Sequence, residues 1–300
     1  MAAVLLSLVS AVGYALAAVA QARLAAGSAP GRGSLRALLR HGGWWAAVGL
    51  NAAGALAHVG ALHYGPLTLV QPLGALTLVA ALPLGAYGAR RRVTRGEWRG
   101  ALWTLAGLVG LVAVTGPATP GDALGIDESL VVAAATASFV ALLTAGRRSG
   151  HGAGLRHATG SGVASGVASA LTQTLTAALA LELPGGPAPW WQTALLAVLI
   201  SGFAVGGLLL SQTAYRAGLA APLAVVNLAN PAAAAVIGVA LLGESFRGGA
   251  WGWLAAAAAS AVAARGVVLL TAAPLPASPA RDAADDTTAP ADPVPANATG

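Results

Sequence analysis

Residues 66–116 read PLTLVQPLGALTLVAALPLGAYGARRRVTRGEWRGALWTLAGLVGLVAVTG. Two apolar stretches, 66–88 and 98–116, meet in a short segment that carries five arginines within ten residues. Each stretch is close to the ~20 residues that a helix needs to cross ~30 Å of hydrocarbon. Arginine in short loops stays on the cytoplasmic side of a membrane. This segment therefore predicts two membrane-spanning helices joined by a cytoplasmic loop.

The same pattern extends along the chain, which has nine apolar stretches of similar length: 2–22, 44–64, 66–88, 98–116, 128–146, 158–181, 190–213, 221–242 and 249–272. Thirteen of the sixteen arginines fall in the odd-numbered gaps: Arg23, Arg32, Arg36, Arg40, Arg90, Arg91, Arg92, Arg95, Arg99, Arg147, Arg148, Arg156 and Arg216. The even gaps hold one arginine, Arg247, and five acidic residues: Asp122, Asp127, Glu128, Glu182 and Glu244. The alternation predicts an all-α polytopic protein of about nine helices in the cytoplasmic membrane, with its N-terminus outside and its C-terminus inside.

Composition excludes several other classes of protein. The chain is 57% hydrophobic and 9% charged, and 300 residues cannot bury that much apolar surface in a soluble core. Its +6 charge lies in scattered loops without interleaved aromatic residues, so we expect a lipid bilayer and no nucleic acid as its partner. Residues 273–300 are rich in proline and aspartate and predict a disordered cytoplasmic tail. The gap 23–43 leaves open a short amphipathic helix at 34–40.

The membrane part looks duplicated, with a first repeat at 1–116 and a second at 128–272. A tyrosine-bearing turn followed by a helix with two prolines occurs at Ala61–Leu73 and again, about 150 residues later, at Ala214–Leu223. The loop pattern makes the first of these helices run inward and the second outward. Inverted repeats of this kind are typical of secondary transporters. Four spans precede residues 117–127 and five follow, so the duplication is imperfect.

These segments resemble the drug/metabolite transporter (DMT, EamA-like) superfamily, which has two inverted multi-helix repeats. The second half carries the resemblance in its tyrosine turn, in Asn230-Pro231, and in the ending Leu241–Glu244. The first half is similar to the NIPA-type magnesium transporters through Trp44-Trp45, Gly54 and the run 66–76. The resemblance implies a transporter fold over most of residues 1–272.

One departure bears on the transported solute. At Ala55 and His58 the magnesium-transporter pattern has a glutamate and an asparagine. A hard divalent cation prefers oxygen ligands with carboxylates among them, so loss of the carboxylate argues against magnesium. We therefore expect a small polar or zwitterionic solute first, moved by a facilitator or a proton-coupled exporter, and keep magnesium as the alternative.

Polar side chains at membrane depth indicate where a solute would bind. The candidates are Asn51, His58, Gln71, Gln173, Asn227 and Asn230, on the second, third, sixth and eighth stretches. The competing interpretation is that such groups only join neighbouring helices. His58 is also the candidate for proton coupling, against a neutral histidine that is hydrogen-bonded to another helix.

Three prolines are predicted to break helices near these amides: Pro72, Pro222 and Pro231. Proline has no N–H for the carbonyl four residues earlier, and a freed carbonyl can coordinate a solute or an ion. Small-residue stripes on the sixth stretch (Gly162, Gly166) and the seventh (Gly202, Gly206) predict close helix packing.

Motifs of enzymes, metal centres and cofactor sites are absent from the sequence, so no catalytic residue, metal ligand or cofactor is predicted. The sequence leaves a homodimer open. A hypothesis of another class is a membrane scaffold or sensor that transports nothing. A packed bundle without a polar cleft at the midplane would favour it.

Overall fold

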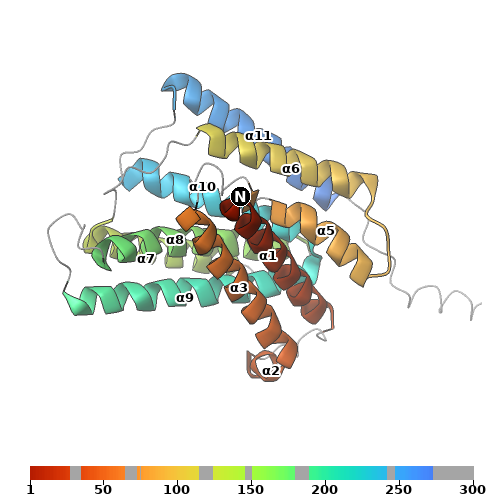
Figure 1. Ribbon diagram of the computed structural model, residues 1–300, viewed down its shortest axis with the longest axis horizontal. Coiled ribbons are helices and arrows are strands. Elements are labelled where there is room, and N and C mark those ends of the chain that lie inside the picture. Colours follow the sequence, from red (N-terminus) through yellow and green to blue (C-terminus); the bar gives the residue numbers. More distant parts are fainter. Residues whose placement is uncertain are drawn as a thin grey trace, which may run out of the picture.

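The computed structural model describes residues 1–27, 35–64, 73–74, 76–114, 124–145, 151–179, 189–241 and 247–272. Its α-helices are α1 (Ala2–Ala26), α2 (Leu35–Arg40), α3 (Gly42–Tyr64), α5 (Leu76–Gly88), α6 (Arg95–Val114), α7 (Ile126–Thr144), α8 (His151–Leu179), α9 (Trp190–Ala214), α10 (Ala220–Leu241) and α11 (Ala250–Thr271). A 3-10 turn, η1 (Tyr215–Ala217), joins α9 to α10. The described residues contain no strand (Figure 1).

Five of these helices are long and apolar enough to cross a membrane: α1, α7, α9 with η1, α10 and α11. The chain is therefore an all-α polytopic membrane protein, as the sequence predicted. Each of the nine expected stretches has a helix, and α2 is the short helix that the gap 23–43 left open. α8 begins at His151, two turns before the expected start at residue 158. The first part of the stretch 66–88 and the tail 273–300 lie outside the described residues.

Burial is distributed as expected of a protein whose outer solvent is lipid. Large apolar side chains point outward, with Leu56 74% and Leu142 79% exposed. Alanine is the most frequent buried residue of the described part, and Ala15, Ala81 and Ala263 are fully buried, together with leucines such as Leu78 and Leu171. Lipid tails are as apolar as leucine, so helices associate through close packing of small residues rather than by hiding large ones.

Helix packing follows one scheme twice. α1 packs against α3 and α5, and α8 packs in the same way against α9 and α10. α5 also contacts α6, as α10 contacts α11, and α6 and α11 pack closely against each other. α7 has no counterpart in the first half and lies on α8. In Figure 1 the α6–α11 pair lies along one side of the bundle.

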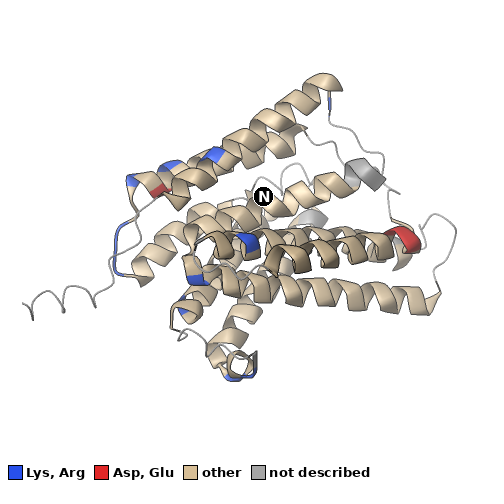
Figure 2. Cartoon of the chain, turned by 180° about the vertical axis from the view of Figure 1, so that it is seen from behind, with Lys and Arg blue, Asp and Glu red and all other residues tan. Residues whose placement is uncertain are grey.

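The helix ends sort into two sets. At one end the guanidinium of Arg23 lies against Gly88, α8 meets η1 at Gly154, and α6 meets α11 at Gly100. At the other end the Arg247 N–H donates to the Val114 carbonyl (3.0 Å), and the Leu124 N–H donates to the Thr174 hydroxyl (3.3 Å). Figure 2 shows most of the arginines toward the first end and the acidic first turn of α7 at the second. Each helix of the first half thus runs opposite to its counterpart in the second half: α1 to α8, α3 to α9, α5 to α10 and α6 to α11.

Candidate functional site

Two of the predicted amides, Asn227 and Asn230, lie on α10 where it packs against α8. A side-chain carbon at Gly166 would lie 2.7 Å from the Asn230 carbonyl oxygen and 3.4 Å from its Oδ1. A side-chain carbon at Gly162 would lie 3.2 Å from the Asn230 nitrogen. The two glycines therefore let α10 approach α8 closely along the Asn230 side, as the predicted small-residue stripe on the sixth stretch implied.

Asn227 is the polar group of this region whose hydrogen bonding is incomplete. Its Nδ2 is buried, and it has no hydrogen-bond partner among the described residues. Pro231 lies four residues further along α10 and has no N–H for the Asn227 carbonyl. One residue therefore offers both a donor and an acceptor that the helix does not use. A buried unpaired amide costs free energy, so a solute or a water molecule that pairs with it is favoured.

The predicted role of the prolines is wrong for two of them. Pro222 lies in the first turn of α10, where a missing N–H costs nothing because it would have no partner in the helix. Pro231 lies inside α10, which remains helical from Ala220 to Leu241. Neither proline ends a helix. Pro83, in α5, is likewise accommodated inside its helix. Pro72 lies outside the described residues.

Asn51 and His58 lie on α3, three residues before and four residues after Gly54. Both are half-buried. Gly54 packs against the Tyr14 ring of α1. A side-chain carbon at Gly13 of α1 would lie 3.2 Å from the Gly54 Cα, so the two helices are in close contact here. Asn51 and His58 therefore flank the contact between α1 and α3. In the described part of the chain α3 packs against α1 and α2, not against α8 or α10.

The two remaining predicted residues do not join either group. Gln173 lies on α8 and is exposed. It lies seven residues, or about two helical turns, after Gly166 on α8. Gln71 lies outside the described residues. The structure thus divides the predicted four-helix site into an α8–α10 part and an α1–α3 part.

A buried amide cluster whose members are not among the predicted site residues joins α1 to α9. The Ser211 hydroxyl donates to Gln21 Oε1 (2.9 Å), and Gln212 Nε2 donates to the Gln21 carbonyl (3.1 Å). All three residues are nearly fully buried, and Gln212 Oε1 has no partner among the described residues. Gln21 was missed because it lies at the last turn of its apolar stretch, where a polar residue reads as interfacial.

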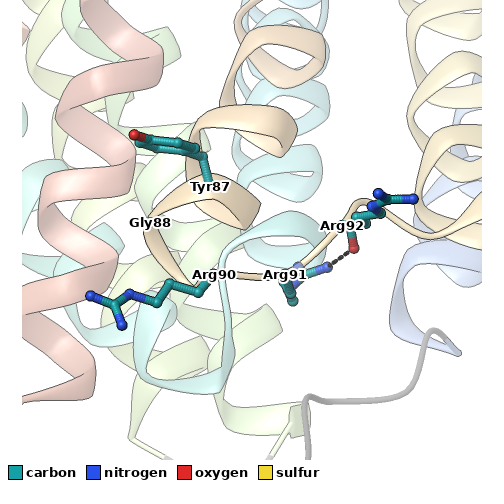
Figure 3. Close-up of a pocket in the computed structure, with 5 residues that line it drawn as sticks. All are labelled: Tyr87, Gly88, Arg90, Arg91 and Arg92. Atoms are coloured by element: carbon teal, nitrogen blue, oxygen red, sulfur yellow. Dashed lines mark hydrogen bonds between the residues drawn. The ribbon is translucent and has the colours of Figure 1, made fainter.

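An open hollow of about 560 Å³ lies at the arginine-rich end of the bundle, lined by Tyr87, Gly88, Arg90, Arg91 and Arg92 (Figure 3). Arg91 is held in place because its guanidinium donates to both carboxylate oxygens of Glu97, at 2.8 and 2.6 Å. Glu97 also accepts from the Thr94 N–H at 2.8 Å. This network fixes the loop between α5 and α6.

The same network sets the charge of the pair. Burial raises the pKa of Glu97, but the hydrogen bonds from Arg91 and Thr94 outweigh it and leave this pKa below its ordinary value. The hydrogen bond to Glu97 raises the pKa of Arg91, which burial alone would lower. Both groups therefore remain charged at neutral pH.

The described residues were compared with the requirements of a metal site, and the chain with known proteins. The described residues include no group of three or more histidine and acidic side chains that could hold a metal ion. Comparisons of the chain with protein-family models, with curated proteins and with solved structures returned no match.

Proposed function

We propose that the chain is a secondary transporter of the drug/metabolite type, which moves a small polar solute across the cytoplasmic membrane by alternating access. The observation that carries the proposal is the packing scheme that occurs twice in opposite directions. α1, α3, α5 and α6 make the same contacts as α8, α9, α10 and α11, and each runs opposite to its counterpart. Inverted repeats supply two halves that can exchange inward-open and outward-open arrangements around one site.

Charge distribution supports the orientation within this proposal. The end that holds Arg23, the arginines between α5 and α6, and Arg216 faces the cytoplasm under the positive-inside rule. The N-terminus then lies outside and α11 ends inside. The acidic first turn of α7 lies on the outer side.

The solute is proposed to bind at Asn227 and Asn230, where α10 meets α8. The unpaired Asn227 Nδ2 donates to a carbonyl or carboxylate of the solute, and the carbonyl freed by Pro231 accepts from its N–H or O–H groups. A site of this kind has no fixed charge. It suits a neutral or zwitterionic solute better than a bare cation, because desolvating a cation requires charged oxygen ligands. Asn51 and His58, on α3 of the first half, remain candidates for a second part of the site.

Motion is proposed to centre on the α6–α11 contact. Gly107 lies against Ala259 and Ala263, and Gly266 lies against Thr104, so these two helices touch backbone to backbone. α6 belongs to the first half and α11 to the second, so their close contact can serve as the axis of the motion. The other helices of the first half would rock about it against the other helices of the second half. The Gln21–Ser211–Gln212 cluster crosses between the halves near the cytoplasmic end and would open when that end opens.

The first experiment identifies the solute. Purified protein is heated with amino acids, nucleobases, polyamines and divalent metals, because a ligand that binds only the folded form raises the melting temperature. The stabilising compound is then assayed for uptake into proteoliposomes. Saturable uptake of a polar metabolite supports the proposal. Saturable magnesium uptake without metabolite uptake would support the alternative, and no transport of any stabilising compound would favour a scaffold or sensor.

Substitutions then test the site. We expect Asn227→Ala and Asn230→Ala each to reduce transport about tenfold or more, since a lost hydrogen bond to a bound polar group costs about 1–3 kcal/mol. Ser201→Ala is the matched control, because the Ser201 hydroxyl is exposed and donates to the Ala197 carbonyl of its own helix (2.7 Å). Equal transport by all three variants would remove the α10 amides from the site.

A further inference from the structure

The turn that ends α5 has an arginine where glycine is the usual residue. The Arg91 N–H donates to the Ala86 carbonyl, and the Arg90 N–H donates to the Tyr87 carbonyl. These two bonds define a helix ending that places the residue after the cap in the left-handed conformation. Here that residue is Arg90, with φ +52°, and it is the one non-glycine residue with positive φ in the described part of the chain. The backbone would favour glycine, so the arginine side chain points to a role of its own.

A second arginine, Arg23, lies at the same corner, against Gly88 two residues before Arg90. Arg23 is in the last turn of α1, so close to Gly88 that a side chain at Gly88 would collide with it. Figure 3 shows Arg90 pointing toward the N-terminal, red-coloured helix, whereas Arg92 points to the opposite side. Arg91 is already paired with Glu97. Arg23 and Arg90 therefore present two exposed positive charges at one corner, where α1 and α5 end.

Above this corner α1 presents an apolar track. Leu5, Val9, Val12 and Leu16 are all exposed and recur at helical spacing, and Arg23 follows seven residues later on the same face. A helix rises 1.5 Å per residue, so Leu16 and Val12 lie about 10 and 16 Å from Arg23 along the axis. That is the depth of one leaflet of a ~30 Å hydrocarbon core. Tyr87, which is 84% exposed, adds an amphipathic ring at the level of the headgroups.

We propose that this corner is a binding site for an anionic phospholipid of the inner leaflet. The lipid phosphate binds between the guanidinium groups of Arg23 and Arg90, and one acyl chain lies along Leu16 and Val12. Guanidinium pairs well with phosphate because its planar N–H groups can donate two parallel hydrogen bonds. The bound lipid would join the ends of α1 and α5, and so stabilise the first half of the bundle.

The test compares lipid binding by the purified full-length chain in mild detergent. Native mass spectrometry measures retention of phosphatidylglycerol and of phosphatidylcholine with the same acyl chains. The variant Arg23→Ala/Arg90→Gly removes both charges, and glycine suits the left-handed turn, so the fold should be preserved. The control variant Arg36→Ala/Arg40→Ala removes the same charge from exposed positions on α2.

We expect the wild type and the control to prefer phosphatidylglycerol. The Arg23/Arg90 variant should lose this preference, by roughly fivefold for each arginine removed. Full preference in that variant, or an equal loss in the control, would overturn the site in favour of a general effect of positive charge. A third arm measures the melting temperature with inorganic phosphate alone. Stabilisation as large as that from phosphatidylglycerol would show a phosphate site rather than a lipid site.

Discussion

Arg91 and Glu97 show what a single pair of residues contributes at the edge of the membrane. Glu97 is 6% exposed and receives three hydrogen bonds from Arg91 and the Thr94 N–H, so its charge is compensated although it is buried. The sequence placed Arg91 in a cytoplasmic loop but gave no sign of this partner. Spacing alone does not distinguish an arginine that marks topology from one that is fixed by a carboxylate six residues later.

Glu97→Gln is expected to lower stability at neutral pH by about 1 kcal/mol, because it removes the ion pair but keeps the size of the side chain. The pKa of Glu97 is lower in the folded state than its ordinary value. Its stabilising effect is therefore complete above about pH 5 and is lost as pH falls through the folded pKa. Melting temperatures at pH 7 and near pH 3.5 check this.

The variant should melt below the wild type at pH 7, and the difference should shrink at low pH. Glu128→Gln serves as the control, since Glu128 accepts from the Gly125 N–H at the opposite end and has no arginine partner in the described part of the chain. A difference that grows as the pH falls would contradict the assignment.

At the scale of helices, glycine positions decide which faces meet. The sequence predicted small-residue stripes on both α8 and α9. Gly162 and Gly166 do meet α10, but the expectation for Gly202 and Gly206 is wrong, because nothing lies within 4 Å of a side chain built at either position. Gly207 instead faces α8, next to the Ser161 carbonyl. A stripe of small residues permits close packing, but a contact forms only where another helix lies against that face.

We therefore expect Gly162→Ala to lower the stability of the folded protein and Gly202→Ala to raise it. A side-chain carbon at Gly162 would lie 2.6 Å from both Ala229 Cβ and the Val226 carbonyl, so α10 must shift, at a cost of about 1–3 kcal/mol. At Gly202 the added methyl meets open space, and the better helix propensity of alanine gains up to about 1 kcal/mol. Thermal unfolding of the purified variants measures both. Equal destabilisation would mean that α8 and α10 do not pack as described.

At the scale of the whole molecule, the two ends differ in charge and the two halves run in opposite directions. The positive-inside rule acts on each loop separately, and the nine stretches expected from the sequence, because they alternate consistently, predict one orientation for the chain. The same alternation makes α1 antiparallel to α8 and α6 antiparallel to α11. Topology and the proposed transport mechanism therefore depend on the same distribution of arginine.

Cysteine labelling can read this orientation directly, since the chain has no cysteine of its own. Ala89→Cys and Ala250→Cys place single thiols at exposed positions at opposite ends of the bundle. We expect a membrane-impermeant maleimide to label Ala250→Cys in intact cells, and Ala89→Cys only after the membrane is opened. The reverse pattern would invert the protein and refute the proposed orientation.

The sequence by itself determined the all-α membrane class and the approximate positions of the helices, because crossing hydrocarbon requires long apolar segments. The side of the membrane on which each loop lies remains a prediction from its charge. These are local properties that need no knowledge of neighbours. Only the tertiary structure decided which helix faces meet, that α10 passes through Pro231 unbroken, and that Gln21 is paired with Ser211. In a bundle whose helix faces are nearly all apolar, small residues decide which faces can pack closely. Close packing requires that the shapes of two helix faces fit each other, and the sequence of one helix does not show which face it will meet.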